Sequence, residues 1–205
     1  MLGNILTKDY AVPDGPYMPD RGAARLAAAM RAAACYLEYG AGGSTLLAAR
    51  IGVADIVSVE SDPAWLSRVE EKLGGVASAS RMHLLSVDIG PTRALGYPAG
   101  SAHRASFRNY PLEPWRRCAD TGLLPDLVLV DGRFRLACML AALRHAKPGC
   151  RVLLDDYRWR AVYRSVERFV RPVAMIGRMA EFIVPDNLPL EKIDEAFEAA
   201  VNDPR

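Results

Sequence analysis

Long apolar runs, histidine and cysteine are all scarce in this chain of 205 residues. No stretch approaches the ~20 apolar residues that a membrane-spanning helix needs, which excludes a helical integral membrane protein. Residues 1–10 have neither a basic start nor an apolar core, so we expect no secretory signal in them. We therefore expect a cytoplasmic protein without a membrane partner.

Cysteine and histidine also lack any metal-binding spacing. The four cysteines stand far apart, at positions 35, 118, 138 and 150, and no Cys-x-x-Cys pair occurs. The three histidines, at positions 83, 103 and 145, form no cluster. Such thiols are typical of reduced, buried side chains in a cytoplasmic protein. We expect neither a disulfide framework nor a metal site built from these residues.

Charge is balanced over the whole chain but not along it. A content of 51% hydrophobic and 24% charged residues is ordinary for a globular protein, and the length predicts one domain over 1–205. The net charge is +2, yet residues 101–172 carry fourteen basic side chains against seven acidic ones. Thirteen of the fourteen are arginine, whose planar fork suits carboxylate or phosphate. Two interpretations remain, a solvated basic surface and an anionic substrate or partner.

A glycine-rich segment organises the rest of the chain. The apolar run 35–37 is followed by Glu38, by three glycines within four positions, and then by Ser44-Thr45 and a helix-forming run over 46–50. This order predicts a strand, a tight loop and a helix that Ser44 or Thr45 caps. Glycine is needed where the backbone turns with positive φ or lies against a ligand. We expect the loop to bind a nucleotide-like ligand.

The acid before the glycines narrows the choice of ligand. A carboxylate at the strand end repels pyrophosphate, and Thr45 replaces the third glycine of the dinucleotide fingerprint G-x-G-x-x-G. A cationic ligand, such as the sulfonium or amino group of S-adenosylmethionine (SAM), suits this place better. The segment 38–45, Glu-Tyr-Gly-Ala-Gly-Gly-Ser-Thr, resembles motif I of the class I SAM-dependent methyltransferases.

The next two predicted strands also end in acids. The strand Asp55–Glu60 is followed by Asp62 as cap and by a helix over Pro63–Leu73 that stops at two glycines. Glu60 stands about twenty residues past the glycine loop, where an acid accepts hydrogen bonds from both ribose hydroxyls. The resemblance implies this role for Glu60, and it implies a contact with the adenine amino group for Asp88, which ends a strand over 81–88.

The remaining elements follow from periodicity and turn residues. Residues 1–19 are predicted to form an extended arm, and Asp20 to cap a helix over 21–34. Residues 90–122, with four prolines, are predicted to be an irregular insertion or lid. The other predicted elements are strand 126–131, helix 134–146, strand 150–154, helix 158–170, a hairpin of strands 173–176 and 179–184, and helix 188–201.

Five strands that alternate with helices predict a parallel, doubly wound α/β sheet. A closing antiparallel hairpin brings the total to seven strands. In a dinucleotide-dependent dehydrogenase, strands and helices would go on alternating in place of this hairpin. The resemblance, which covers residues 21–184, implies the Rossmann-like sheet of the class I methyltransferases.

Ligands of such sheets bind beyond the carboxyl ends of the strands. Five predicted strand ends carry six acids, and six carboxylates repel one another unless cations share the site. SAM supplies a sulfonium and an ammonium group. The predicted cofactor-binding residues are Glu38, Gly40, Ala41, Gly42, Ser44, Thr45, Glu60, Ser61, Asp88 and Asp131.

Methyl transfer needs an aligned nucleophile and often a base. We predict Asp131 and Asp156 as catalytic residues, with Asp155 and His103 as alternative bases. In catechol-type O-methyltransferases, an Asp after the fourth strand and an Asp-Asn pair after the fifth hold a divalent cation. Asp131 and Asp156 match that pattern, but Tyr157 stands where Asn would be. We expect no metal, and Mg²⁺ held by Asp131, Asp155 and Asp156 is the alternative.

The sequence thus predicts a SAM-dependent methyltransferase that acts at oxygen on a small or glycan-like acceptor, including an anionic one. Two alternatives are an inactive SAM-binding module of the same fold and an NAD-dependent oxidoreductase. Nucleic-acid binding is not expected, because no recognition helix, zinc knuckle or base-flipping motif is present. A run of arginines either neutralises the acids or binds an anionic substrate: Arg133, Arg135, Arg158, Arg160 and Arg164.

Overall fold

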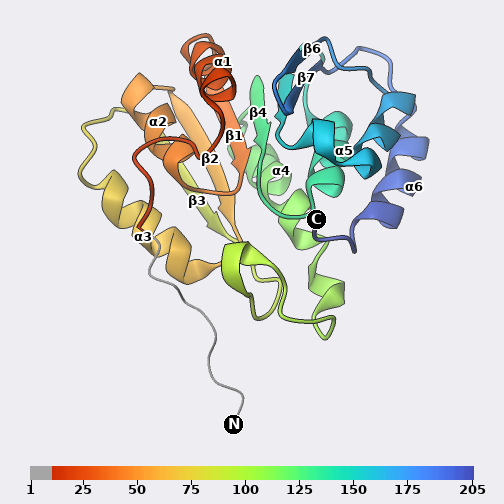
Figure 1. Ribbon diagram of the computed structural model, residues 1–205, viewed down its shortest axis with the longest axis horizontal. Coiled ribbons are helices and arrows are strands. Elements are labelled where there is room, and N and C mark those ends of the chain that lie inside the picture. The colour runs from red at the N-terminus through yellow and green to blue at the C-terminus, as the bar shows by residue number, and fades with distance from the viewer. Residues whose placement is uncertain (1–10) are drawn as a thin grey trace.

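The computed structural model describes residues 11–205, and seven of their segments pair into one sheet (Figure 1). The strands are β1 (Cys35–Tyr39), β2 (Asp55–Glu60), β3 (Arg81–Ser86), β4 (Leu127–Val130), β5 (Arg151–Leu154), β6 (Ala174–Ile176) and β7 (Met179–Ile183). Their order is β3-β2-β1-β4-β5-β7-β6. The first five are parallel, and β7 is antiparallel to both β5 and β6. The predicted fold class is therefore confirmed.

Helices and 3₁₀ segments connect these strands. The helices are α1 (Asp20–Arg31), α2 (Gly43–Ile51), α3 (Pro63–Leu73), α4 (Asn109–Thr121), α5 (Arg135–His145) and α6 (Leu190–Ala200). The 3₁₀ segments are η1 (Ala94–Gly96), η2 (Arg104–Ser106), η3 (Tyr157–Trp159) and η4 (Ala161–Arg168). Over residues 11–205, no helix combines the length and the apolar character needed to cross a membrane.

The central strand β4 shows how the core forms on both faces of the sheet. Successive side chains of a strand point to opposite faces. Leu127 and Leu129 pack in a cluster with side chains of α1 and α2. Val128 and Val130 pack in a second cluster with side chains of α4, α5 and α6. Because both faces are covered, the strand is a continuous apolar run rather than an alternating one.

The helix α3 begins and ends as its sequence predicts. The Oδ1 atom of Asp62 accepts hydrogen bonds from the backbone N–H groups of Ala64 and Trp65, at 3.0 and 3.2 Å. Pro63 takes the first helical position, where its missing N–H costs nothing. This cap holds the chain directly after β2, so that Glu60 lies at the carboxyl edge of the sheet.

Asp20 does not cap α1, contrary to the prediction. Pro19 is the capping residue and makes no side-chain hydrogen bond, and Asp20 lies in the first turn. An acid there still interacts favourably with the helix dipole.

The prediction of an irregular segment over 90–122 is wrong for its second half, which forms α4. Pro111 lies in the first helical turn, where an N–H group has no partner in any case. Pro114, further along the helix, has no N–H group and so removes one backbone hydrogen bond of α4. Buried Tyr110, Trp115 and Cys118 supply the apolar face that holds this helix against the sheet.

The segment after β5 also differs from its prediction as an α-helix. It consists of η3 and η4, which are 3₁₀ segments. Buried Tyr163 and Val166 lie three residues apart, and that spacing keeps both on one face of a helix with three residues per turn.

Candidate functional site

A cavity of about 850 Å³ lies along the edge of the sheet where the parallel strands end. Its size falls within the range of small-molecule sites. The glycine loop, the ends of β2 and β4, the loop over 90–97 and the arm over 13–17 line it. The cavity crosses the point between β1 and β4 where the strand order reverses, the usual ligand site of such sheets.

Two glycines bring the ends of β1 and β4 close together. Gly40 has a φ of 97°, and a Cβ atom there would lie 3.0 Å from the backbone of Gly132. A Cβ atom on Gly132 would lie 2.2 Å from the hydroxyl of Tyr110. Both positions therefore require glycine. The backbone of the loop from Gly40 to Gly43 faces the cavity without side chains in the way.

Glu38 does not reach the cavity, and the predicted contact of its carboxylate with a ligand is not supported. The side chain is fully buried. Its oxygens accept hydrogen bonds from the hydroxyls of Tyr36, Ser44, Thr45 and Ser58. Burial raises the pKa of this carboxyl, and the hydroxyl donors oppose that shift. Glu38 therefore fixes the start of α2 from inside the core.

Thr45 and Ser44 serve the loop in different ways. The Oγ1 atom of Thr45 accepts a hydrogen bond from the N–H of Gly42 at 2.9 Å, so Thr45 braces the turn and does not line the cavity. Ser44 does line it, while its hydroxyl donates to Glu38. Neither is the cap of α2, because Gly42 takes that position.

Glu60 lies where the sequence predicts, in the cavity wall at the end of β2. Its Oε1 atom accepts hydrogen bonds from the N–H groups of Ser61 and Asp62, at 2.7 and 3.0 Å. The Ser61 hydroxyl donates to the same atom. Within residues 11–205, Oε2 receives no hydrogen bond. Burial raises the pKa of this carboxyl, and the N–H donors act against it.

A loop after β3 covers this part of the cavity. The hydroxyl of Ser61 donates to the carbonyl of Gly96 at 3.3 Å, which holds the loop on β2. Leu95 has a φ of 62° and lies in the cavity wall, largely exposed. Asp88 is also in the wall, and its Oδ1 accepts the N–H of Gly90 at 2.8 Å.

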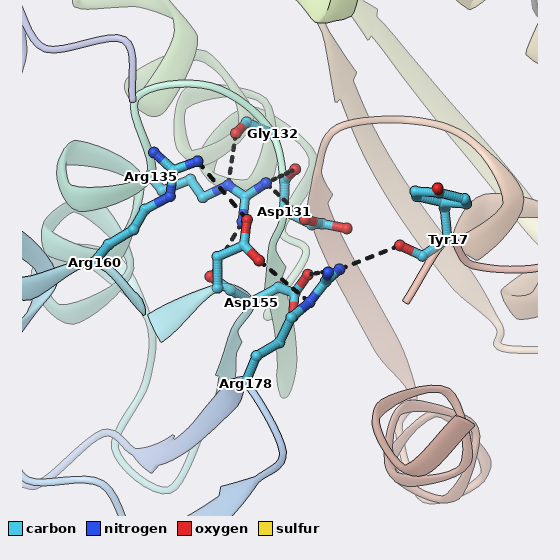
Figure 2. Close-up of polar contacts among 8 residues, drawn as sticks. Tyr17, Asp131, Gly132, Arg135, Asp155, Arg160 and Arg178 are labelled. Carbon is cyan, nitrogen blue, oxygen red and sulfur yellow. Dashed lines mark hydrogen bonds and ion pairs between the residues drawn. The ribbon is translucent and has the colours of Figure 1, made fainter. Parts of the chain in front are cut away.

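Three aspartates and three arginines form a polar network at the other end of the cavity (Figure 2). Asp131 lies 2.9 Å from Arg135, and Arg135 lies 3.1 Å from Asp156. Arg178 binds both oxygens of Asp155 at 2.6 and 2.9 Å, and it reaches Asp156 at 3.2 Å. The network thus joins the ends of β4 and β5 to the turn of the β6–β7 hairpin.

Asp131 has the ionisation behaviour of a proton acceptor. Burial raises the pKa of its carboxyl to about 7, and the neighbouring Asp155 and Asp156 add to the shift. Arg135 opposes it. A carboxyl that titrates near neutral pH in a cavity wall can take up and release a proton in a reaction.

The other two candidate bases are not in the cavity wall. Asp155 is fully buried behind Arg178. The His103 ring is exposed and packs on Gly90. The three aspartates are directed at guanidinium groups, and among residues 11–205 no group of three His, Cys, Asp or Glu side chains is arranged to hold a metal ion.

The arm is a part of the site whose role the sequence did not predict. Pro13, Pro16 and Tyr17 line the cavity. The Lys72 ammonium donates to the carbonyl of Val12, and it pairs with Asp14 at 2.8 Å. Figure 1 shows this segment, in dark red, running past α2 towards α1. One wall of the cavity is therefore made by a segment without regular structure.

The contact between the arm and the loop depends on a third glycine. A Cβ atom on Gly43 would lie 1.9 Å from the carbonyl oxygen of Gly15. The run of glycines was the only indication in the sequence of this close approach.

Trp65 was not predicted as a cavity residue, and Arg133, predicted to neutralise the acids or to bind an anionic substrate, stacks on an aromatic ring instead of pairing with an acid of residues 11–205. The Trp65 indole donates to the carbonyl of Ala41 at 2.7 Å, which ties α3 to the loop. Arg133 stacks on the ring of Tyr97, with its guanidinium carbon 4.1 Å from the ring centre.

Comparisons with known proteins locate the chain among solved structures. No family model and no curated protein sequence matches it. A methyltransferase-like protein from Silicibacter pomeroyi DSS-3 is 36% identical, with a TM-score of 0.84 over 94% of this chain and 100% of that one. An O-methyltransferase from Bacillus cereus, solved in complex with SAH, is 14% identical, with a TM-score of 0.53 over 84% and 82% of the two chains. The second similarity shows the fold alone.

Proposed function

Because the chain belongs to the class I SAM-dependent methyltransferase family, we propose that the cavity binds SAM and that the protein methylates an oxygen of a small acceptor. The acceptor class includes glycan-like hydroxyl compounds. The proposal rests on the geometry of the cavity wall, taken residue by residue.

The observation that carries the proposal is the Oε2 atom of Glu60. The backbone N–H groups after β2 hold Oε1, so the carboxylate is fixed in orientation. Glu60 lines the cavity, and its Oε2 atom has no hydrogen-bond partner among residues 11–205 and can accept hydrogen bonds from the two ribose hydroxyls. Hydrogen bonds to a charged group in a partly buried place are strong enough to select a nucleoside.

The remaining walls fit the other parts of SAM. The loop at Gly40, Ala41 and Gly42 lets the ligand lie against the backbone. Asp88, at the outer edge, is placed to meet the adenine amino group. Asp131 lies beyond the loop, where a carboxylate suits the ammonium of the amino-acid part.

Asp131 is the residue that acts on the acceptor during methyl transfer. When bound, SAM supplies an electrophilic methyl group. Asp131 accepts the proton of the acceptor hydroxyl, and its raised pKa fits that task. Arg135 orients the carboxylate from 2.9 Å. Asp156 positions Arg135 and Arg178 and does not act as a second base, because both guanidiniums occupy its oxygens.

The test is calorimetric titration of the protein with SAM, S-adenosylhomocysteine (SAH) and NAD. We expect micromolar binding of SAM and SAH and no binding of NAD, because the loop lacks the third glycine of a dinucleotide site. Absence of SAH binding would overturn the proposal.

Transfer itself needs a second readout. Protein incubated with methyl-labelled SAM and a panel of alcohols, phenols and amines should label an oxygen compound. Label found on amines alone would refute O-methylation, and SAH binding without label on any compound would favour an inactive binding module.

A further inference from the structure

The cavity extends past the place proposed for SAM. Glu60 ends β2 and Asp156 follows β5, three strand steps away, or about 14 Å at ~4.8 Å per step. With the ribose at Glu60 and the amino-acid part over β1 and β4, the compartment over β5 is left for the acceptor. Its wall includes Asp156, Arg160, Arg178 and Tyr17.

Two arginines of this compartment are engaged by carboxylates and carbonyls of the protein. Arg135 donates to the carbonyls of Asp131, Gly132 and Asp155 and pairs with two carboxylates. Arg178 binds both oxygens of Asp155 and also contacts the carbonyl of Tyr17. All three nitrogens of Arg135 are therefore engaged, and the Nε and Nη2 atoms of Arg178 are held by the network.

Arg160 is different. Its nearest carboxylate oxygen is Oδ2 of Asp156 at 3.9 Å, which is beyond hydrogen-bond distance. That oxygen already lies 3.1 Å from Arg135. In the part of the chain that the structure describes, no hydrogen bond reaches the Arg160 guanidinium. Figure 2 shows this group next to that of Arg135, at the edge of the network.

Charge and shape around Arg160 favour a particular ligand. Arg135, Arg160 and Arg178 stand in the cavity wall at this end, and the carboxylates of Asp131, Asp155 and Asp156 pair closely with Arg135 and Arg178, which leaves Arg160 as the cation available to a ligand. The exposed ring of Tyr17 lines the cavity, and the exposed ring of Trp159 lies beside Arg178, with 5.9 Å between its centre and the guanidinium carbon. A planar anion meets both features, since guanidinium groups bind carboxylate and phosphate through paired N–H donors.

We propose that Arg160 binds a carboxylate or phosphate group of the methyl acceptor, so that the substrate is a hydroxylated organic anion. This inference rests on the proposed function, because it assumes that SAM fills the rest of the cavity. The amino-acid carboxylate of SAM has the same chemistry, but the strand spacing places it over β1 and β4, short of Arg160.

The experiment uses the protein saturated with SAH and three probes, namely inorganic phosphate, 4-hydroxybenzoate and its neutral amide. We expect the wild-type complex to bind 4-hydroxybenzoate about tenfold or more tightly than the amide, and to bind phosphate in competition with it. Arg160→Gln should remove this preference. Arg164→Gln is the matched control, because Arg164 is exposed and outside the cavity wall, and it should keep the preference.

The outcomes separate this inference from the proposed function. Lack of SAH binding would overturn both. SAH binding without any preference for the anionic probes, or a preference that survives Arg160→Gln, would overturn only the acceptor assignment. SAH affinity should stay within about twofold in Arg160→Gln. A tenfold loss for SAH, absent for its decarboxylated analogue, would assign Arg160 to the cofactor carboxylate and overturn the inference.

Discussion

The Glu60 carboxylate is the residue on which cofactor binding depends most directly. Replacing it by alanine in Glu60→Ala removes the acceptor of the ribose hydroxyls. We expect SAH affinity to fall by about 1.5–3 kcal/mol, the scale of hydrogen bonds to a charged group. Calorimetric titration measures this loss. The control is Glu71→Ala, at an exposed position of α3, which should bind SAH as the wild type does. If Glu60→Ala binds SAH as tightly as this control, the assignment of the ribose to Glu60 is wrong.

Asp131 sets the pH dependence of turnover. Its carboxyl must be ionised to accept a proton, and burial raises its pKa to about 7. Turnover should therefore rise with pH through about 7 and fall about tenfold for each unit below it. The pH profile of kcat/KM for SAM, which reports ionisable groups of the free enzyme, measures this.

The variant Asp131→Asn should lower turnover about 100-fold or more, and it should lower SAH affinity much less, because an amide still accepts a hydrogen bond from the ammonium group. The remaining rate should no longer rise through neutral pH. If the variant is as active as the wild type, Asp131 takes no part in the reaction.

Glu38 and Glu60 show what a sequence can tell about single residues. Both are acids at the end of a predicted strand, and the pattern assigns a ligand to each. Only the folded chain shows that four hydroxyls surround Glu38, while Glu60 lines the cavity with one oxygen held by backbone N–H groups. Side-chain direction at a strand end depends on neighbours that are distant in the sequence, such as Ser58 for Glu38.

Among the elements, the arm over 11–19 closes one side of the cavity. Its anchor is Lys72, which holds the Val12 carbonyl and the Asp14 carboxylate. In Lys72→Met we expect the arm to open more often, so that amide exchange over 12–17 becomes faster and SAH affinity falls about two- to fivefold. Hydrogen exchange read by mass spectrometry measures the opening.

The matched control is Lys192→Met, at an exposed position of α6. It should leave both the exchange over 12–17 and the SAH affinity unchanged. Exchange in Lys72→Met as slow as in the wild type would mean that the other contacts of the arm hold it without Lys72, namely Arg50 with the Asp14 carbonyl and Gly15 with Gly43.

Elements with strong start and stop residues were predictable, and α3 and β2 have the predicted bounds. The helix α4 was not, because Pro111 and Pro114 suggest a loop unless the burial of its other face is known. The 3₁₀ form of η4 could not be predicted either. Tyr163 and Val166 are three residues apart, and this spacing fits an α-helix as well as a 3₁₀ helix.

At the scale of the whole molecule, the two-sided core holds the strand ends in place. Leu129 in β4 is fully buried between β1 and β5. We expect Leu129→Ala to lower the free energy of unfolding by about 2–5 kcal/mol, through lost burial and the cavity it leaves. Urea denaturation measures this value. Leu124→Ala, at a position 65% exposed, should change it by no more than about 0.5 kcal/mol.

A loss below about 1 kcal/mol in Leu129→Ala would show that the core around β4 repacks freely. The site would then not depend on a rigid sheet, and the close contact between Gly40 and Gly132 would lose its support.

The alternation of strands and helices made the topology predictable, because parallel strands need right-handed crossovers. The strand order, with its reversal between β1 and β4, was not predicted and comes from the structure. The Arg–Asp network could not be predicted in the same way, since it joins Arg178 of the hairpin turn to Asp155 and Asp156 across strand ends. Only the assembled sheet brings those charges together.

The most direct test of the account is a crystal structure of the protein grown with SAH. The account predicts both ribose hydroxyls of SAH within hydrogen-bond distance of Glu60, and the amino-acid part over β1 and β4 next to Asp131. SAH bound elsewhere, or a cavity without SAH at saturating concentration, would contradict it.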